Sequence, residues 1–170
     1  MGPARELKKA LERYWSSPND ERPLREEAAR IRARHWKEQA AAGIDVIPSG
    51  DFSLYDHVLD AAAMLGAVPA RYGTGDGPVG LPAYFAMARG SQAAGRDVPA
   101  LEMTKWFDTN YHYIVPELAP RQTFRLSFTQ VLDHFAEARD QGILTRPVLP
   151  GPVTFLSLAK TTSENTDPLG

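Results

Sequence analysis

Short apolar runs alternate with longer amphipathic segments along this chain, and this alternation constrains the fold more than any other feature. The run 43–48 (GIDVIP) lies between helical segments that we predict for 21–42 and 53–65. Two more strands are predicted near 101–106 and 146–149, with helices at 129–141 and 153–160. Strands separated by helices are typical of parallel βα units, so the pattern predicts an α/β fold with a parallel sheet of three strands at most.

The helical segments carry recognisable start and stop signals. The first, 6–15, places Leu7 and Leu11 on one apolar stripe. The second has Pro23 in its first turn, where a missing N–H costs nothing, and Gly43 directly after its end. For the third, Ser53 and Asp56 have the spacing of a capping box. We expect a further short helix at 83–88 and an extended piece at 110–115.

Composition excludes several classes of protein. The 170 residues are 43% hydrophobic and 24% charged, which is typical of a globular domain, and the net charge of −2 does not favour nucleic acid. Because cysteine is absent, the chain has no disulfide, thiolate zinc site or cysteine nucleophile. No apolar run approaches a membrane span and the N-terminus lacks a signal-peptide core, so we expect a cytoplasmic protein without membrane contact.

Positive charge is concentrated near the N-terminus. Residues 1–40 contain ten Lys or Arg and seven Asp or Glu, whereas the remainder contains nine and fourteen. Arg5 and Lys8 are three residues apart at a helix start, so they reach the same side, where the helix N-terminus adds partial positive charge. This arrangement suits a carboxylate or phosphate tail, and ordinary solvated side chains are the alternative.

Two further segments could carry chemistry. After the strand at 43–48, Asp51 could orient a ligand, bind a cation or cap the next helix, and Asp56 with His57 could act in acid–base catalysis. The run 102–113 (EMTKWFDTNYHY) follows neither a helical nor a strand period. It suits a ligand with a flat ring and carboxylates, or else forms a buried aromatic cluster.

The sequence gives little support for a metal site, a nucleotide-binding loop or a hydrolase. His57 and His112 are 55 residues apart without HxH or HExxH spacing, which argues against a metal site. GxSxG and P-loop patterns do not occur. A small hydrolase that uses Asp51, His57, Glu102 and His112 is a weaker alternative.

The same segments resemble the N-terminal half of cobalamin-independent methionine synthase. The resemblance rests on 5–10 (RELKKA), 43–45, 50–59 (GDFSLYDHVL), 102–117 and 151–155 (GPVTF), and the run 102–113 is its most specific part. It covers nearly the whole chain, with the Gly- and Pro-rich loops as the divergent regions.

The resemblance implies an enzyme of two (βα)₈ barrels that transfers a methyl group from 5-methyltetrahydropteroyltriglutamate to homocysteine, giving methionine. It implies a zinc ion in the C-terminal barrel, held by Cys, His and Glu, and an N-terminal barrel that helps to bind the folate polyglutamate tail. By motif, the substrate-binding residues fall on Arg5, Glu6, Leu7, Lys8 and Lys105. No catalytic residue and no metal ligand is implied for this chain.

Departures from the family pattern shape our expectations. The family's Gly-Phe-Pro-Arg strand before the basic helix has no counterpart, because the chain opens Met-Gly-Pro. We therefore expect residues 1–160 to form an incomplete (βα)₈-type barrel with its first strand missing, and 161–170 to be a polar, disordered tail. We expect the chain alone to be inactive, with homocysteine bound only by the full-length enzyme. The alternative is a non-catalytic binding module that oligomerises through its open barrel edge.

Overall fold

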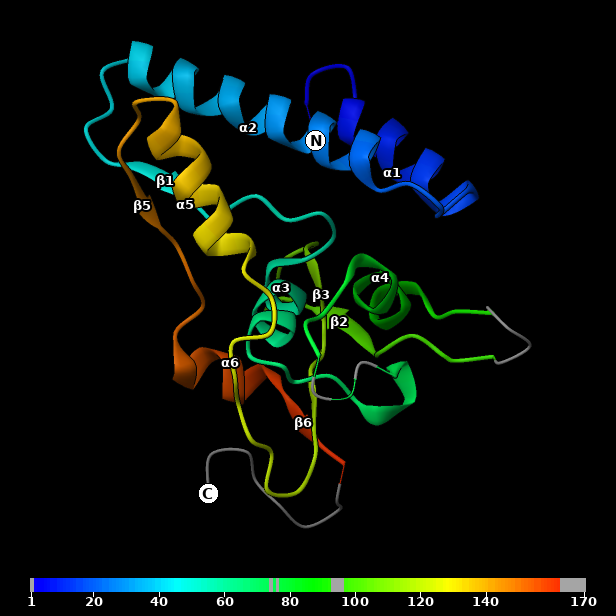
Figure 1. Ribbon diagram of the computed structural model, residues 1–170. Helices are drawn as coiled ribbons and strands as arrows, with labels where there is room; N and C mark the ends of the chain where they lie inside the picture. The colour runs from blue at the N-terminus through cyan, green and yellow to red at the C-terminus, as the bar shows by residue number, and fades with distance from the viewer. Residues whose placement is uncertain (1, 74, 76, 93–96, 163–170) are drawn as a thin grey trace. The chain divides into compact units, whose positions relative to one another are not determined.

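The computed structural model describes residues 2–73, 75, 77–92 and 97–162, and its elements are labelled in Figure 1. The chain divides into two compact units. The first comprises Met1–Leu54 with Val131–Val148, and the second comprises Tyr55–Gln130 with Leu149–Gly170. Each unit is therefore built from two separate stretches of sequence.

The first unit combines helices with one pair of parallel strands. Helix α1 (Glu6–Ser16) lies beside α2 (Arg22–Ala41), and the predicted stripe of α1 is buried in the core (Figure 1). Strand β1 (Ile47–Ser49) pairs in parallel with β5 (Thr145–Pro147). Helix α5 (Gln130–Asp140) precedes β5, and its Ala138 packs with Trp36 and Ile47 in one apolar cluster. The sequence prediction of parallel strands with helices is confirmed here.

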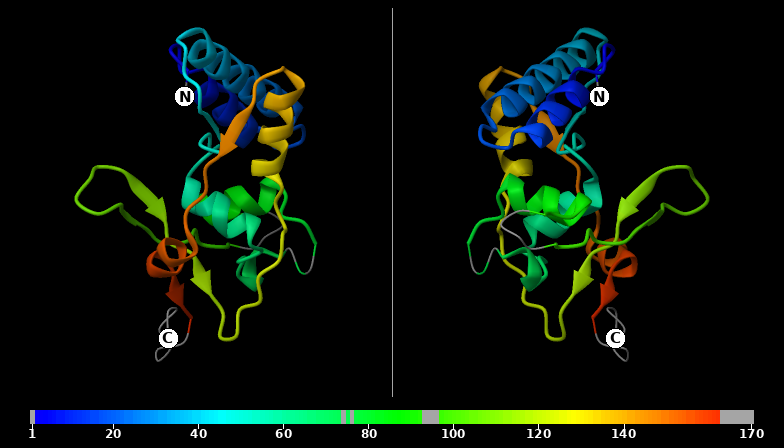
Figure 2. Two further views of the ribbon diagram at one scale, coloured as in Figure 1. Left: turned by 90° about the vertical axis from the view of Figure 1, so that its left-hand side faces the viewer. Right: turned by 90° about the vertical axis from the view of Figure 1, so that its right-hand side faces the viewer.

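The second unit holds the remaining elements. Its helices are α3 (His57–Met64), η1 (Ala70–Tyr72, a 3₁₀ turn), α4 (Leu81–Arg89) and α6 (Pro152–Leu158). Strands β2 (Met103–Lys105) and β3 (His112–Ile114) are antiparallel, whereas β4 (Glu117–Leu118) and β6 (Lys160–Thr161) are parallel. The apolar core of the unit includes Val58, Tyr113 and Phe155. Figure 2 shows the connection between β2 and β3 projecting from this unit.

Several sequence predictions need correction. Six short strands in three pairs replace the three strands that we expected, and no closed barrel is formed by residues that the structure describes. The segment 110–115 returns antiparallel to β2, because a connection of six residues is too short for a parallel crossover. The helix predicted from 153 to 160 ends at Leu158, and Thr161 belongs to β6 rather than to a disordered tail. The rest of that tail, 163–170, lies outside the described residues.

Helix boundaries differ from prediction where capping differs. The third helix begins at His57 and not near 53, because the Asp56 carboxylate accepts the Leu59 N–H at 2.9 Å and is itself the N-cap. The helix predicted from 83 begins at Leu81, so that Pro82 occupies its first turn. Across the described part of the chain, no helix is both long and apolar enough to span a membrane.

Candidate functional site

The four consecutive residues at the start of α1 have different surroundings. Arg5 is exposed, has φ 59° and ψ 36°, and makes no side-chain hydrogen bond or ion pair with the described residues. Lys8 is exposed, with its Nζ 3.7 Å from Glu12 Oε1. Leu7 is only 3% exposed and belongs to the core.

Glu6 acts inside the first unit. Its carboxylate accepts the Ala4 N–H at 3.0 Å and lies 3.4 Å from Arg34 Nη1. Hydrogen bonds from its own backbone and from Arg34 hold the pKa of Glu6 below its ordinary value. Glu6 is thus paired with a cation of α2, and the exposed cations at this helix start are Arg5, Lys8 and Lys9.

Lys105 is the last residue of β2, in the second unit. Its side chain is exposed, and it makes no hydrogen bond or ion pair within the described ranges. In the register of the hairpin, Lys105 stands opposite His112. Nearby, Glu102 is occupied by a close ion pair with Lys160. The predicted cations therefore lie in both units, and each is exposed where it lies.

A buried carboxylate organises the second unit around α3. Asp56 is 2% exposed, and its Oδ2 accepts the N–H groups of Leu59 at 2.9 Å and Ile114 at 3.1 Å. Its Oδ1 accepts the Tyr111 hydroxyl at 2.6 Å. Asp56 thus links the start of α3 to β3 and to the end of the β2–β3 connection through three hydrogen bonds.

His57 and three aromatic side chains lie next to this carboxylate. The His57 Nδ1 is 3.0 Å from the Tyr111 oxygen, and the two rings are stacked at 5.6 Å with an interplanar angle of 28°. The Trp106 ring centre is 5.1 Å from that of His57, and Phe107 packs edge-on against Trp106. Tyr111 is 43% exposed and Phe107 73% exposed. We call the set His57, Trp106, Phe107 and Tyr111 the aromatic cluster.

Tyr84 extends the polar network below α3. Its hydroxyl donates to Asp60 Oδ1 at 2.6 Å and accepts the Tyr55 N–H at 3.2 Å. Gln130 donates to the other oxygen of Asp60 at 3.0 Å. Burial raises the pKa of Tyr84 well above its ordinary value, with Asp60 adding to the effect. Sequence reasoning missed this pair, although an acidic residue one turn after Asp56 in an otherwise apolar helix was a signal for it.

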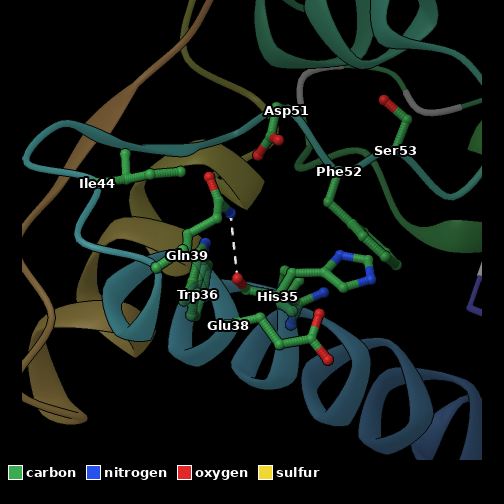
Figure 3. Close-up of a pocket in the computed structure, with 10 residues that line it drawn as sticks. His35, Trp36, Glu38, Gln39, Ile44, Asp51, Phe52 and Ser53 are labelled. Carbon is green, nitrogen blue, oxygen red and sulfur yellow. Dashed lines mark hydrogen bonds between the residues drawn. The ribbon is translucent and has the colours of Figure 1, made fainter.

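The first unit contains a hollow of about 600 Å³ beside the C-terminal half of α2. Figure 3 shows Asp51 and Phe52 facing His35 and Gln39 across it. Asp51 is exposed and does not cap α3, so that part of its predicted role is wrong. Phe52 lies under the Arg32 guanidinium, 5.3 Å from it, and Arg32 is bound to Glu137.

The described residues do not bring together the side chains that a metal site or a hydrolase would need. No group of three or more His, Cys, Asp or Glu able to hold a metal ion occurs in the part of the chain that the structure describes. With no cysteine in the sequence, these residues do not fit a Cys-containing zinc site. His112 Nδ1 lies 3.0 Å from the Asn110 carbonyl, and Glu102 is paired with Lys160. Among the described residues, no hydrogen bond or ion pair joins Glu102 or His112 to His57.

These elements define a mixed α/β domain with short parallel strand pairs and exposed cations at a helix start and a strand end. Residues 1–169 match the family described as "Cobalamin-independent synthase, N-terminal domain". The chain therefore belongs to the cobalamin-independent methionine synthase family, and it matches the N-terminal domain of that family.

Relatives named 5-methyltetrahydropteroyltriglutamate–homocysteine methyltransferase are similar over almost the whole chain. The protein of Caulobacter vibrioides is 55% identical and that of Parvibaculum lavamentivorans 56% identical, each over 99% of this chain. The protein of Nitrobacter winogradskyi is 52% identical over the same share. The match spans 24%, 22% and 24% of these relatives, so the chain spans about a quarter of their length.

Proposed function

We propose that this chain supplies part of the methyl-donor site of a 5-methyltetrahydropteroyltriglutamate–homocysteine methyltransferase. In this proposal Arg5, Lys8 and Lys105 bind the glutamate tail of the donor. The observation that carries the proposal is that all three cations are exposed, while Arg5 and Lys105 have no acidic partner among residues the structure describes. The names of the relatives support a triglutamate substrate.

The chemistry of the tail matches these side chains. Each glutamate adds a carboxylate, and Arg or Lys forms charge-assisted hydrogen bonds with it. Arg5 and Lys8 also lie at the positive end of α1, which favours an anion. Lys8 would exchange its exposed Glu12 contact for a ligand carboxylate, at little cost because exposed ion pairs contribute only about 0–1 kcal/mol.

Glu6 and Leu7 take indirect roles in this proposal. Leu7 anchors the helix in the core, and Glu6 fixes its start through Arg34. We place zinc and homocysteine binding outside this chain, since its residues do not fit the zinc ligands that the resemblance implies. The expected consequence is that the purified chain binds the donor without transferring its methyl group, and methionine formation by the chain alone would contradict this.

Titration calorimetry tests the binding proposal. The chain should bind folate triglutamate more tightly than folate monoglutamate, and Lys8→Ala and Lys105→Ala should each weaken the triglutamate complex about threefold. Lys9→Ala is the matched control, because Lys9 is an exposed neighbour that carries no assigned role. Equal effects of Lys8→Ala and Lys9→Ala would contradict a specific role for Lys8.

A second candidate function is a non-catalytic interaction module. The β1–β5 pair has only two strands, and Val46, Leu144 and Val148 beside it are at least 50% exposed. A strand edge with unpaired N–H and C=O groups and exposed apolar side chains is a template for pairing with another chain. Light scattering across a concentration series tests this candidate: self-association that a Leu144→Lys variant abolishes favours it, and a monomer at all concentrations argues against it.

A further inference from the structure

We infer that the aromatic cluster is a subsite for the p-aminobenzoyl ring of the methyl donor, with His57 Nε2 accepting a hydrogen bond from the ligand. This inference rests on the proposed function, since it assigns the part of the donor that adjoins the glutamate tail. It concerns residues to which the tail-binding proposal gives no role.

The first step is the state of Tyr111. Its hydroxyl has one proton, and the 2.6 Å contact with Asp56 Oδ1 places that proton toward the carboxylate. Burial and the neighbouring Asp56 raise the pKa of Tyr111 above its ordinary value, so the hydroxyl stays protonated at neutral pH. The Tyr111 oxygen is then an acceptor for its other close neighbour.

The second step fixes the tautomer of His57. Its Nδ1 lies 3.0 Å from the Tyr111 oxygen, whose proton is already directed at Asp56, so Nδ1 must be the donor. In neutral imidazole the other nitrogen is then an acceptor. Nε2 has no hydrogen-bond partner within the described ranges, and the His57 side chain is 37% exposed. The buried Asp56 and Tyr111 thus present a defined acceptor at the surface.

The third step is the surface around that acceptor. Trp106 and Tyr111 lie within 6 Å of the His57 ring centre, and Tyr111 and Phe107 are well exposed. Exposed aromatic faces beside a hydrogen-bond acceptor suit a planar ring that carries an N–H, because stacking and the hydrogen bond act together. The p-aminobenzoyl group is such a ring.

The fourth step is the position along the hairpin. Trp106 follows Lys105 directly, and consecutive Cα atoms are about 3.8 Å apart. In the donor the p-aminobenzoyl carbonyl forms the amide bond to the first glutamate, so a ring and a carboxylate are also close neighbours. A ligand whose tail reaches Lys105 therefore has its ring within reach of the aromatic cluster.

Binding of two probes separates the ring from the tail. We expect p-aminobenzoyl-triglutamate to bind about tenfold more tightly than γ-linked triglutamate, which has the same carboxylates without the ring. His57→Ala should reduce this advantage to about threefold, whereas His112→Ala, an exposed histidine of the same hairpin, should leave it unchanged. Equal affinities for the two probes would overturn the inference but leave tail binding intact. If neither probe bound, the proposed function would fail with it.

Nitrogen NMR of the ligand-free chain gives a readout independent of affinity. For the neutral imidazole of His57 we expect a protonated Nδ1 and a bare Nε2, and Tyr111→Phe should remove this preference while the fold is retained. A protonated Nε2 in the unmodified chain would overturn the inference, because the acceptor would then be absent. A bare Nε2 whose signal p-aminobenzoyl-triglutamate shifts, and triglutamate does not, supports it.

Discussion

Replacing Asp56 with alanine tests how strongly one carboxylate stabilises the second unit. Asp56 accepts three hydrogen bonds: the α3 cap from Leu59, the N–H of Ile114 and the hydroxyl of Tyr111. Loss of an N-cap costs about 1 kcal/mol. The Ile114 residue is 1% exposed, so its unpaired N–H adds about 1–3 kcal/mol, whereas Tyr111 can turn to water. The sum is about 3 kcal/mol.

Urea unfolding and amide exchange measure this loss. Asp56→Ala should lower the free energy of unfolding of the second unit by about 3 kcal/mol and accelerate hydrogen exchange at Ile114. Asp51→Ala is the matched control, because this exposed carboxylate has no hydrogen-bond or ion-pair partner in the described residues and should change stability by less than about 0.5 kcal/mol. Equal effects of the two substitutions, or unchanged exchange at Ile114, would refute the reasoning.

Two other predictions concern a buried histidine and two glycines. Burial, with the nearby Arg32 charge, lowers the pKa of His134 to about 3, so the folded chain binds fewer protons than the unfolded chain between that value and about 6.5. Stability should therefore fall as the pH drops through this interval, and acid titration of His134→Phe should show a shallower fall; an identical fall would contradict a neutral buried ring. Gly90→Ala should lower the thermal unfolding temperature more than Gly43→Ala does. Both glycines have φ near +75°, so the backbone strain of the substitution is similar at the two positions. A Cβ at Gly90, however, would lie 2.8 Å from the Val98 carbonyl oxygen, whereas a Cβ at Gly43 meets nothing within 4 Å. Equal losses would show that the close approach is relieved by a backbone shift.

Local signals in the sequence were sufficient for much of the first unit. Pro23 and Gly43 mark the ends of α2 because each has a strong backbone preference that does not depend on distant residues. The apolar run before Pro48 predicted a strand, and β1 does pair in parallel with β5. Both strands are only three residues long, and each of their residues is paired with one in the other strand.

The second unit depends on contacts that a single sequence does not display. Asp56 caps α3 in preference to Ser53 because the same carboxylate also binds Ile114, 58 residues away. The antiparallel return of β3 follows from the tight turn at 106–111, where the Thr109 N–H and hydroxyl both donate to the Trp106 carbonyl. The aromatic character of 102–113 was visible, but the alignment of His57 by Tyr111 was not.

The cations Arg5, Lys8 and Lys105 were predicted from the family resemblance rather than from their spacing alone. Helical periodicity placed Arg5 and Lys8 together, but it gave no reason to separate Glu6, which pairs with Arg34, from its exposed neighbours. Lys105 stood in a run without periodicity, and its exposure became evident only with the hairpin register. Charge placement at a helix start was therefore predictable, whereas the roles of individual side chains required their partners.

The affinity ratio between folate triglutamate and folate monoglutamate tests the central claim most directly. Two added carboxylates, each worth about 0.7 kcal/mol, should make the triglutamate bind about tenfold more tightly to the unmodified chain. In the combined variant Arg5→Ala, Lys8→Ala, Lys105→Ala, the ratio should fall to about one. A tenfold ratio that persists in this variant, or equal binding of both folates to the unmodified chain, would contradict the assignment of the tail to these cations.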